Sequence, residues 1–219
     1  IKRRSRKIIN DFQLSEDDYY QLNRVMGLDI ETNKLLPEGP IAIKSRSEVI
    51  DKIISHLETK NLQIKNGYLE KIFKNIHSKF SEEAYKFIVP ISPALQLLNI
   101  LKEFKVKLFL ITSDTKQNAD ETIRYLNLNN YFEDVIGGDS GYGDKKSGTS
   151  CRYLCKKMNL NKKNVISIGD APVDNEMAIN GSLRASILVE SGQIEMKVIS
   201  KFSKYCVSDL SEITIEKSI

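Results

Sequence analysis

The stretch VISIGDAPVDNEMA, residues 165–178, decides how the second half of this chain is interpreted. Its first part, Val165–Ile168, is mainly apolar and β-branched, which is typical of a strand covered on both faces in a parallel sheet. Asp170 follows this strand almost directly, and Asp174 lies just before a helical stretch at 175–179. Both carboxylates are therefore expected beyond the C-terminal end of the strand, where open α/β sheets bind ligands.

Two carboxylates at this spacing call for an explanation, because like charges so close together repel each other. A hard cation that prefers oxygen ligands, such as Mg²⁺, would remove the repulsion. A turn followed by a helix N-cap also uses aspartates in this way. On these residues alone, both the metal site and the simple turn stay open.

The composition favours a protein with a substantial core and sets few other limits. The 219 residues are 41% hydrophobic, and the net charge of +4 is spread along the chain, which does not predict nucleic-acid binding. The densest basic run, KRRSRK at residues 2–7, is interpreted as a solvated helix face. We find no secretory signal and no apolar stretch near the ~20 residues that span a bilayer, so we expect no membrane partner.

The cysteines indicate packing and not metal binding. The three cysteines and two histidines are too scattered to predict a zinc site. Cys151, Leu154, Cys155 and Met158 share helical spacing, so Cys151 and Cys155 are expected in the core. A reducing, cytoplasmic setting is the corresponding expectation, with monomer and homodimer both open.

The chain is expected to divide near Pro90. Residues 1–88 are polar and helical in pattern, with apolar faces along 47–58 and 69–80 and a loop at 36–46. After Pro90, buried strands alternate with helices, which predicts a parallel sheet with helices on both faces. The expected strands are 107–112, 134–138, 165–169, 185–190 and one near 204–210, and the expected helices are 92–104, 116–128, 147–160 and 175–180. Ser92 is expected to cap the first of these helices.

Three of the predicted strands end in residues that can do chemistry. The strand 107–112 ends in Thr112, followed by Ser113, and the loop after 134–138 carries Lys145 and Lys146. The third strand is the one that precedes the two aspartates. Because the carboxyl ends of parallel strands lie at one edge of a sheet, a hydroxyl, an ammonium group and two carboxylates there predict a site for a phosphate and a cation.

The order and spacing of these residues resemble the haloacid dehalogenase (HAD) superfamily of phosphatases, in particular its phosphoglycolate phosphatase-like branch. The resemblance runs from about Ile91 to the C-terminus, through ISPALQLLNILKEFKVKLFLITSD (91–114), GGDSGYGDKKSG (137–148) and VISIGDAPVDNEMA, which is similar to the family's GD-x-x-x-D motif. It implies a Rossmann-like α/β core at 89–219 and a helical cap domain at 1–88, although the first 88 residues match in length and helical character only.

The resemblance also implies roles for individual residues. Thr112 would bind the transferring phosphoryl group, helped by the backbone N–H of Ser113. Lys145 would offset negative charge, with Lys146 as the alternative because the proline that usually follows this lysine is missing. Asp170 and Asp174 would hold Mg²⁺. The implied activity is hydrolysis of a small phosphorylated metabolite through an aspartyl-phosphate.

The first motif of that family, D-x-D-x-T/V, is absent from this sequence. Its first aspartate is the nucleophile, and its second is the general acid and base. The stretch GLDIETN (27–33), with Asp29 and Glu31, is interpreted as a chance likeness, since no apolar strand precedes it. The resemblance implies that the nucleophile lies upstream of Ile1, on a strand between those that bear Thr112 and Asp170. We therefore expect a fragment that is inactive by itself, and poorly stable because the two neighbouring strands would have unsatisfied backbone groups.

Two other functions remain compatible with the motifs. The first is a phosphosugar mutase of the same fold, which returns the phosphoryl group to another hydroxyl of the sugar. The second is a non-catalytic relative that binds phosphorylated ligands, which is the better interpretation if the first motif is truly missing. Fold alone does not choose among them.

Overall fold

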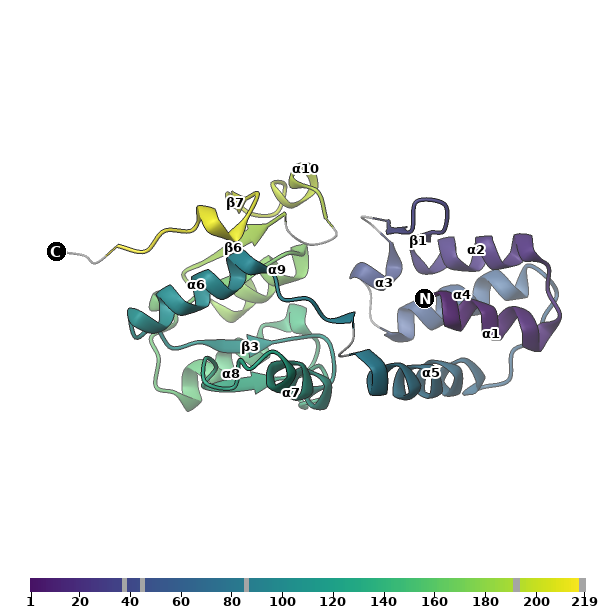
Figure 1. The fold of residues 1–219 in the computed structure, drawn as a ribbon, viewed down its shortest axis with the longest axis horizontal. Helices are drawn as coiled ribbons and strands as arrows, with labels where there is room; N and C mark the ends of the chain where they lie inside the picture. Colours follow the sequence, from purple (N-terminus) through teal and green to yellow (C-terminus); the bar gives the residue numbers. More distant parts are fainter. Residues whose placement is uncertain (37–38, 44–45, 85–86, 191–193, 217–219) are drawn as a thin grey trace. The chain divides into compact units, whose positions relative to one another are not determined.

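The structure is a computed structural model that describes residues 1–36, 39–43, 46–84, 87–190 and 194–216. The chain forms two compact units, Ile1–Ala84 and Tyr85–Ile219, shown in Figure 1. The division falls a few residues before the expected one at 88/89. Within the described ranges, no helix is long and apolar enough to cross a membrane.

The first unit is helical, with one small hairpin. Its elements are α1 (Lys2–Phe12), α2 (Glu16–Met26), β1 (Leu28–Asp29), β2 (Lys34–Leu35), α3 (Pro40–Ile43), α4 (Arg46–Glu58) and α5 (Tyr68–Ala84). The predicted apolar faces of α4 and α5 are confirmed, because they meet α1 and α2 in one buried cluster of Ile8, Ile9, Leu22, Met26, Val49, Ile50, Ile53, Leu57, Leu69, Ile72 and Phe73. The stretch 36–46 is not a plain loop, since α3 begins at Pro40, a residue suited to the first turn of a helix.

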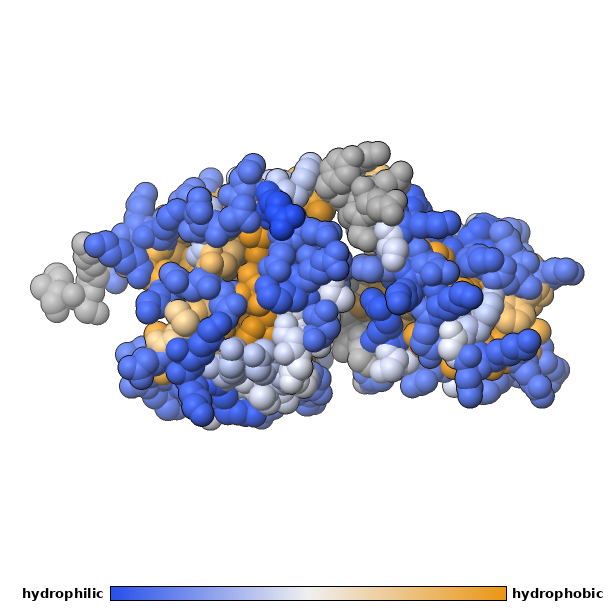
Figure 2. Space-filling view, turned by 90° about the horizontal axis from the view of Figure 1, so that it is seen from below, coloured by the Kyte–Doolittle hydropathy of each residue, from blue (hydrophilic) through white to orange (hydrophobic). Residues whose placement is uncertain are grey.

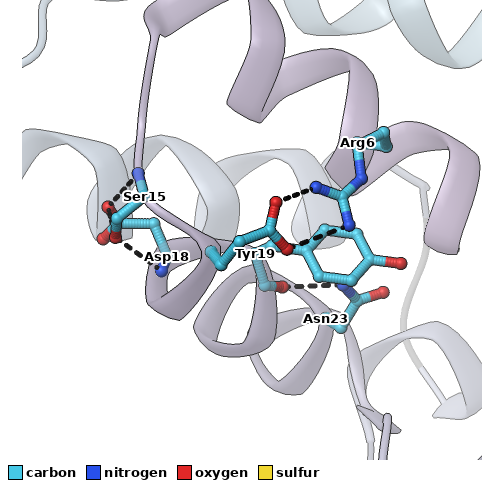
Figure 3. Close-up of polar contacts among 6 residues, drawn as sticks. Arg6, Ser15, Asp18, Tyr19 and Asn23 are labelled. Carbon is cyan, nitrogen blue, oxygen red and sulfur yellow. Dashed lines mark hydrogen bonds and ion pairs between the residues drawn. The ribbon is translucent and has the colours of Figure 1, made fainter.

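The junction of α1 and α2 shows how the basic run is accommodated (Figure 3). Ser15 and Asp18 form a capping box, in which the Asp18 N–H donates to Ser15 Oγ at 3.2 Å and the Ser15 N–H donates to Asp18 Oδ2 at 3.0 Å. Arg6 pairs with Glu16, and its guanidinium lies 3.8 Å from the centre of the Tyr19 ring. The basic run is therefore a helix face partly neutralised within its own unit.

The second unit alternates strands and helices, as predicted. Its elements are α6 (Ser92–Glu103), β3 (Phe109–Ile111), α7 (Lys116–Tyr125), β4 (Asp134–Ile136), the 3₁₀ turn η2 (Lys145–Ser147), α8 (Thr149–Lys157), η3 (Lys162–Asn164), β5 (Ile166–Gly169), α9 (Pro172–Gly181), β6 (Ala185–Val189), α10 (Met196–Ile199), β7 (Tyr205–Val207) and η4 (Leu210–Glu212). The strands are shorter than expected, but each lies within its predicted range.

Three helix starts differ from the expectation, those of α6, α8 and α9. Ile91, not Ser92, is the N-cap of α6, and Ser92 forms the first helical position, with Pro93 in the first turn where its missing N–H costs nothing. The predicted helix 147–160 is observed as α8 at Thr149–Lys157, divided from η2, to which Ser147 belongs. The division falls at Gly148, whose φ of 68° lies in the left-handed region and interrupts a right-handed helix.

The strands of the second unit form two separate parallel groups. β3 pairs with β4, and β6 pairs with both β5 and β7. No ladder joins β3 to β5 in the part of the chain that the structure describes, so each has an edge without a strand neighbour. Ile166 and Ile168, which share one face of β5, are 46% and 37% exposed, whereas Leu188 of β6, aligned with Gly169 on the other face, is fully buried. Figure 2 shows apolar surface running across this unit.

Helices connect the two groups of strands. Ile111 at the end of β3 and Val165 just before β5 pack against one buried cluster, which contains Cys151, Cys155, Met177, Ala178 and Leu183. The expectation that Cys151 and Cys155 are core residues is confirmed. Because α8 and α9 supply most of this cluster, they contact both groups, which no ladder joins among the described strands.

Candidate active site

Thr112 and Ser113 follow β3 directly. The N–H of Thr112 donates to the carbonyl oxygen of Ile136 at 2.9 Å, which ties this strand end to the end of β4. The Thr112 hydroxyl oxygen accepts the N–H of Asp114 at 3.1 Å, so its own proton stays available to donate. Ser113 is exposed. Neither hydroxyl bonds to the lysine or the aspartates of the site among the described contacts.

Lys145 and Asp174 form the closest contact of the site. Nζ of Lys145 lies 2.6 Å from Oδ1 of Asp174, with the two side chains 17% and 5% exposed. Oδ2 of Asp174 accepts the N–H of Ala171 at 3.1 Å. The expectation that Asp174 precedes the helix was wrong: α9 begins at Pro172, so Asp174 lies in its first turn, where a carboxylate is favoured by the helix dipole.

The last residue of β5 is Gly169, and the side chain of Asp174 lies against it. A Cβ atom at Gly169 would be 2.1 Å from Cγ of Asp174, a separation that no side chain tolerates. The missing Cβ allows the strand end and the carboxylate to approach each other. This answers why a glycine stands between the apolar run and the two aspartates.

Asp170 is the accessible carboxylate of the pair. Partial burial of its carboxyl group, followed by the charge of Asp174, raises its pKa above the ordinary value, and Lys145 opposes this shift. One ammonium group thus faces two carboxylates, which leaves the site with net negative charge. Oxygen donors with this charge fit Mg²⁺, which usually takes one or two carboxylates and keeps several waters. The described residues contain no cluster of three or more His, Cys, Asp or Glu side chains.

Lys146 faces away from these carboxylates. Its Nζ lies 2.9 Å from Oε1 of Glu176, and its side chain is 60% exposed. Of the two lysines that the sequence left open, Lys145 is therefore the one beside Asp174. Asp29 and Glu31 lie in the first unit, where Asp29 Oδ1 accepts the Glu31 N–H at 3.0 Å within the turn between β1 and β2.

Asp170→Asn should stabilise the metal-free protein. The substitution removes the charge that Asp174 and the surrounding protein disfavour, and gains of this kind at functional sites are roughly 0.5–2 kcal/mol. The pKa of Asp170 is raised in the folded state, so the stability of the wild type falls as pH rises through that shifted pKa. The stability gained by Asp170→Asn should therefore be present at neutral pH and disappear in acid. Thermal melts at both pH values test this, and an equal or lower melting temperature at neutral pH would contradict it.

Sequence reasoning missed the side chains that surround the lysine. Arg152 of α8 and Asn180 of α9 both bond to the segment that carries Lys145. No motif marks either residue, because their contacts arise only when α8 and α9 pack together.

The fold and the site together describe an α/β protein in which a lysine and two aspartates lie beyond the end of β5. The family model described as haloacid dehalogenase-like hydrolase matches residues 42–187, and the chain belongs to this family.

Individual relatives match the chain over different lengths. A protein of Acanthamoeba polyphaga mimivirus that carries the name ankyrin repeat protein L100 is 27% identical over 213 residues, which is 94% of this chain and 33% of that protein. Phosphoglycolate phosphatase of Neisseria gonorrhoeae is 26% identical over 132 residues, or 60% of this chain and 56% of the enzyme. The chain thus spans between one third and just over half of these curated relatives.

The same fold occurs in a solved structure. The crystal structure of a haloacid dehalogenase-like hydrolase from Bacteroides fragilis superposes with a TM-score of 0.70 at 15% identity, covering 97% of this chain and 90% of that one. At this level of identity the similarity concerns the fold alone.

Proposed function

We propose that the protein containing these residues is a Mg²⁺-dependent phosphatase that hydrolyses a small phosphomonoester. The observation that carries this proposal is the group at the end of β5, where the accessible Asp170 lies beside the Lys145–Asp174 ion pair. Relatives that are phosphoglycolate phosphatases support the same class of substrate. A small phosphorylated metabolite is therefore the proposed partner.

Each residue has a proposed part in this reaction. Thr112 donates its hydroxyl proton to a phosphoryl oxygen, and the exposed backbone N–H of Ser113 assists it. The ammonium group of Lys145, held by Asp174, offsets the charge that develops on the phosphoryl group. Asp170 and Asp174 would hold Mg²⁺, which when bound neutralises phosphate charge and orients the substrate.

The attacking carboxylate is proposed to lie on a further strand between β3 and β5. Support comes from the two strand groups, since β3 and β5 each have one edge that no strand of the described residues pairs with. A strand there would end beside Thr112 and Asp170, where its aspartate could form the aspartyl-phosphate. Residues 1–219 alone are then expected to bind Mg²⁺ and phosphate without turnover.

The helical first unit is proposed to be the cap that selects the substrate. Within this unit lies a cleft of about 620 Å³, lined by Arg24, Val25, Pro40, Asp51, Lys52 and Ser55. Arg24 and Lys52 outweigh the charge of Asp51 there, which suits an anionic group on the substrate. Closing a cap over the site would exclude water from the reaction.

Mg²⁺ binding measured by calorimetry gives the first test. Wild-type 1–219 should bind Mg²⁺, whereas Asp170→Asn should weaken binding by at least about 10–100-fold, the loss typical even of residues that only support a metal ligand. Glu176→Gln is the matched control, because Glu176 lies on the same helix and pairs with Lys146 instead. If wild type fails to bind Mg²⁺, or both variants weaken binding equally, the proposal fails.

Measurements of turnover distinguish the phosphatase from the mutase and from the non-catalytic binding protein. Residues 1–219 and a variant extended at its N-terminus by an apolar strand ending in Asp-x-Asp should be assayed with p-nitrophenyl phosphate and Mg²⁺. Phosphate release by the extended variant alone supports the phosphatase, and turnover by 1–219 itself would refute the proposed strand nucleophile. If both bind Mg²⁺ and phosphate and neither turns over, the non-catalytic function is correct. Product analysis with a sugar phosphate would reveal a mutase.

A further inference from the structure

The segment that carries Lys145 has little rigidity of its own. η2 is a single 3₁₀ turn of three residues, Lys145–Ser147. Gly141 and Gly143 precede it and Gly148 follows it, all at positive φ of 83°, 75° and 68°. Glycine loses more conformational freedom on ordering than any other residue, so the position of the lysine depends on contacts from outside the segment.

Arg152 of α8 supplies the first of these contacts. Its Nη1 donates to the carbonyl oxygen of Ser147 at 3.1 Å and to that of Asn180 at 2.5 Å, and its Nη2 donates to Oγ1 of Thr149 at 2.9 Å. One guanidinium group therefore joins the end of η2, the start of α8 and the end of α9. Hydrogen bonds from a charged donor are stronger than neutral ones.

Asn180 of α9 supplies the second contact. Its Nδ2 donates to the carbonyl oxygen of Lys146 at 2.8 Å. Two consecutive carbonyl groups of η2, those of Lys146 and Ser147, are thus bonded by side chains from two different helices. These bonds fix the backbone immediately after Lys145.

The backbones of the two helices also meet at this point. A Cβ at Gly148 would lie 2.3 Å from the backbone nitrogen of Gly181, so the start of α8 contacts the end of α9 directly. Asp174 lies on the first turn of the same α9. A contact that fixes η2 against the end of α9 therefore sets the distance from Lys145 to its carboxylate partner.

We propose that Arg152 and Asn180 are positioning residues that hold the Lys145 segment against α9, so that Nζ of Lys145 stays on Asp174. Neither side chain bonds to Lys145 Nζ, Asp170 or Asp174 in the described structure, so both act through the backbone of η2. Their importance for phosphoryl transfer rests on the proposed function, whereas their effect on the lysine does not.

Trace acetylation with acetic anhydride, read by peptide mass spectrometry, tests this directly. The rate of Lys145 modification is divided by that of Lys163, an exposed lysine of η3 in the same molecule. This ratio should rise about tenfold in Arg152→Ala and in Asn180→Ala, because each loses a hydrogen bond of about 1 kcal/mol that fixes the η2 backbone beside Lys145. Arg152→Lys keeps a charged donor and should restore part of the protection.

Arg184→Ala is the matched control, because this arginine is exposed and its side chain makes no hydrogen bond or ion pair in the described structure. Its ratio should equal that of wild type. Thermal melts establish that each variant is folded. An unchanged ratio in both folded variants, or an equal rise in Arg184→Ala, would overturn the proposal.

The acetylation ratio needs neither substrate nor turnover, so it is independent of the proposed function. If the ratio rises while wild type fails to bind Mg²⁺, the positioning role stands and the phosphatase proposal fails. If wild type binds Mg²⁺ while the ratio is unchanged, the positioning role alone fails.

Discussion

Lys145→Ala should lower the free energy of unfolding of the second unit by about 3 kcal/mol. Removing one partner of a buried ion pair typically costs about 3–5 kcal/mol, because the other charge is left buried without compensation. The lower end applies since the Lys145 side chain retains 17% exposure, although Asp174 retains only 5%. The measurement is urea unfolding, with hydrogen exchange of amides in the second unit as the readout.

Two variants make this expectation specific. Lys146→Ala removes the neighbouring lysine, which is 60% exposed in its pair with Glu176, and should cost less than about 1 kcal/mol. Lys145→Ala combined with Asp174→Asn removes both charges of the buried pair and should recover most of the loss. Equal costs for the two single lysine variants would show that the Lys145–Asp174 contact does not stabilise the unit.

Hydrogen exchange should distinguish β5 sharply from β6. β6 has a strand on each side, so all its amides are expected to be protected. β5 is paired only with β6, and those of its amides that point away from β6 should exchange at least about a hundredfold faster. The amides of β3 should divide in the same way, because β3 is paired only with β4.

Exchange measured residue by residue on 1–219 checks this expectation. The matched reference is β6 within the same molecule, which removes differences in global stability. Uniform protection along β5 would contradict the prediction and show that something covers its outer edge in solution. The variant extended by a strand should protect the outer amides of both β3 and β5 and leave β6 unchanged.

The elements of the second unit could be predicted from the sequence because they depend on neighbours along the chain. Apolar runs mark β3, β5 and β6, and helical spacing placed Cys151 and Cys155 in the core. The position of Asp170 after a strand follows from the same local pattern. The exact ends of the helices were predicted less well, since the sequence analysis missed both the helix boundary at Gly148 and the N-cap at Ile91.

Within the site, the sequence could identify the residue types and their order but not which atoms meet. Lys145 and Lys146 are adjacent in the sequence, and only their places in η2 direct one to Asp174 and the other to Glu176. The contacts of Arg152 and Asn180 with η2 carry no sequence signal at all.

By itself, the sequence determined the alternation of strands and helices and the placement of two aspartates after β5, since both depend on periodicity and on residues a few positions apart. The tertiary structure alone decided that Lys145 reaches Asp174 while Lys146 pairs with Glu176, and that Arg152 and Asn180 bond to the backbone of η2. The physical reason is that strand pairing and side-chain contacts join residues far apart in the chain. Local preferences do not distinguish between the possible arrangements of such residues, and the packing of α8 against α9 selects one of them.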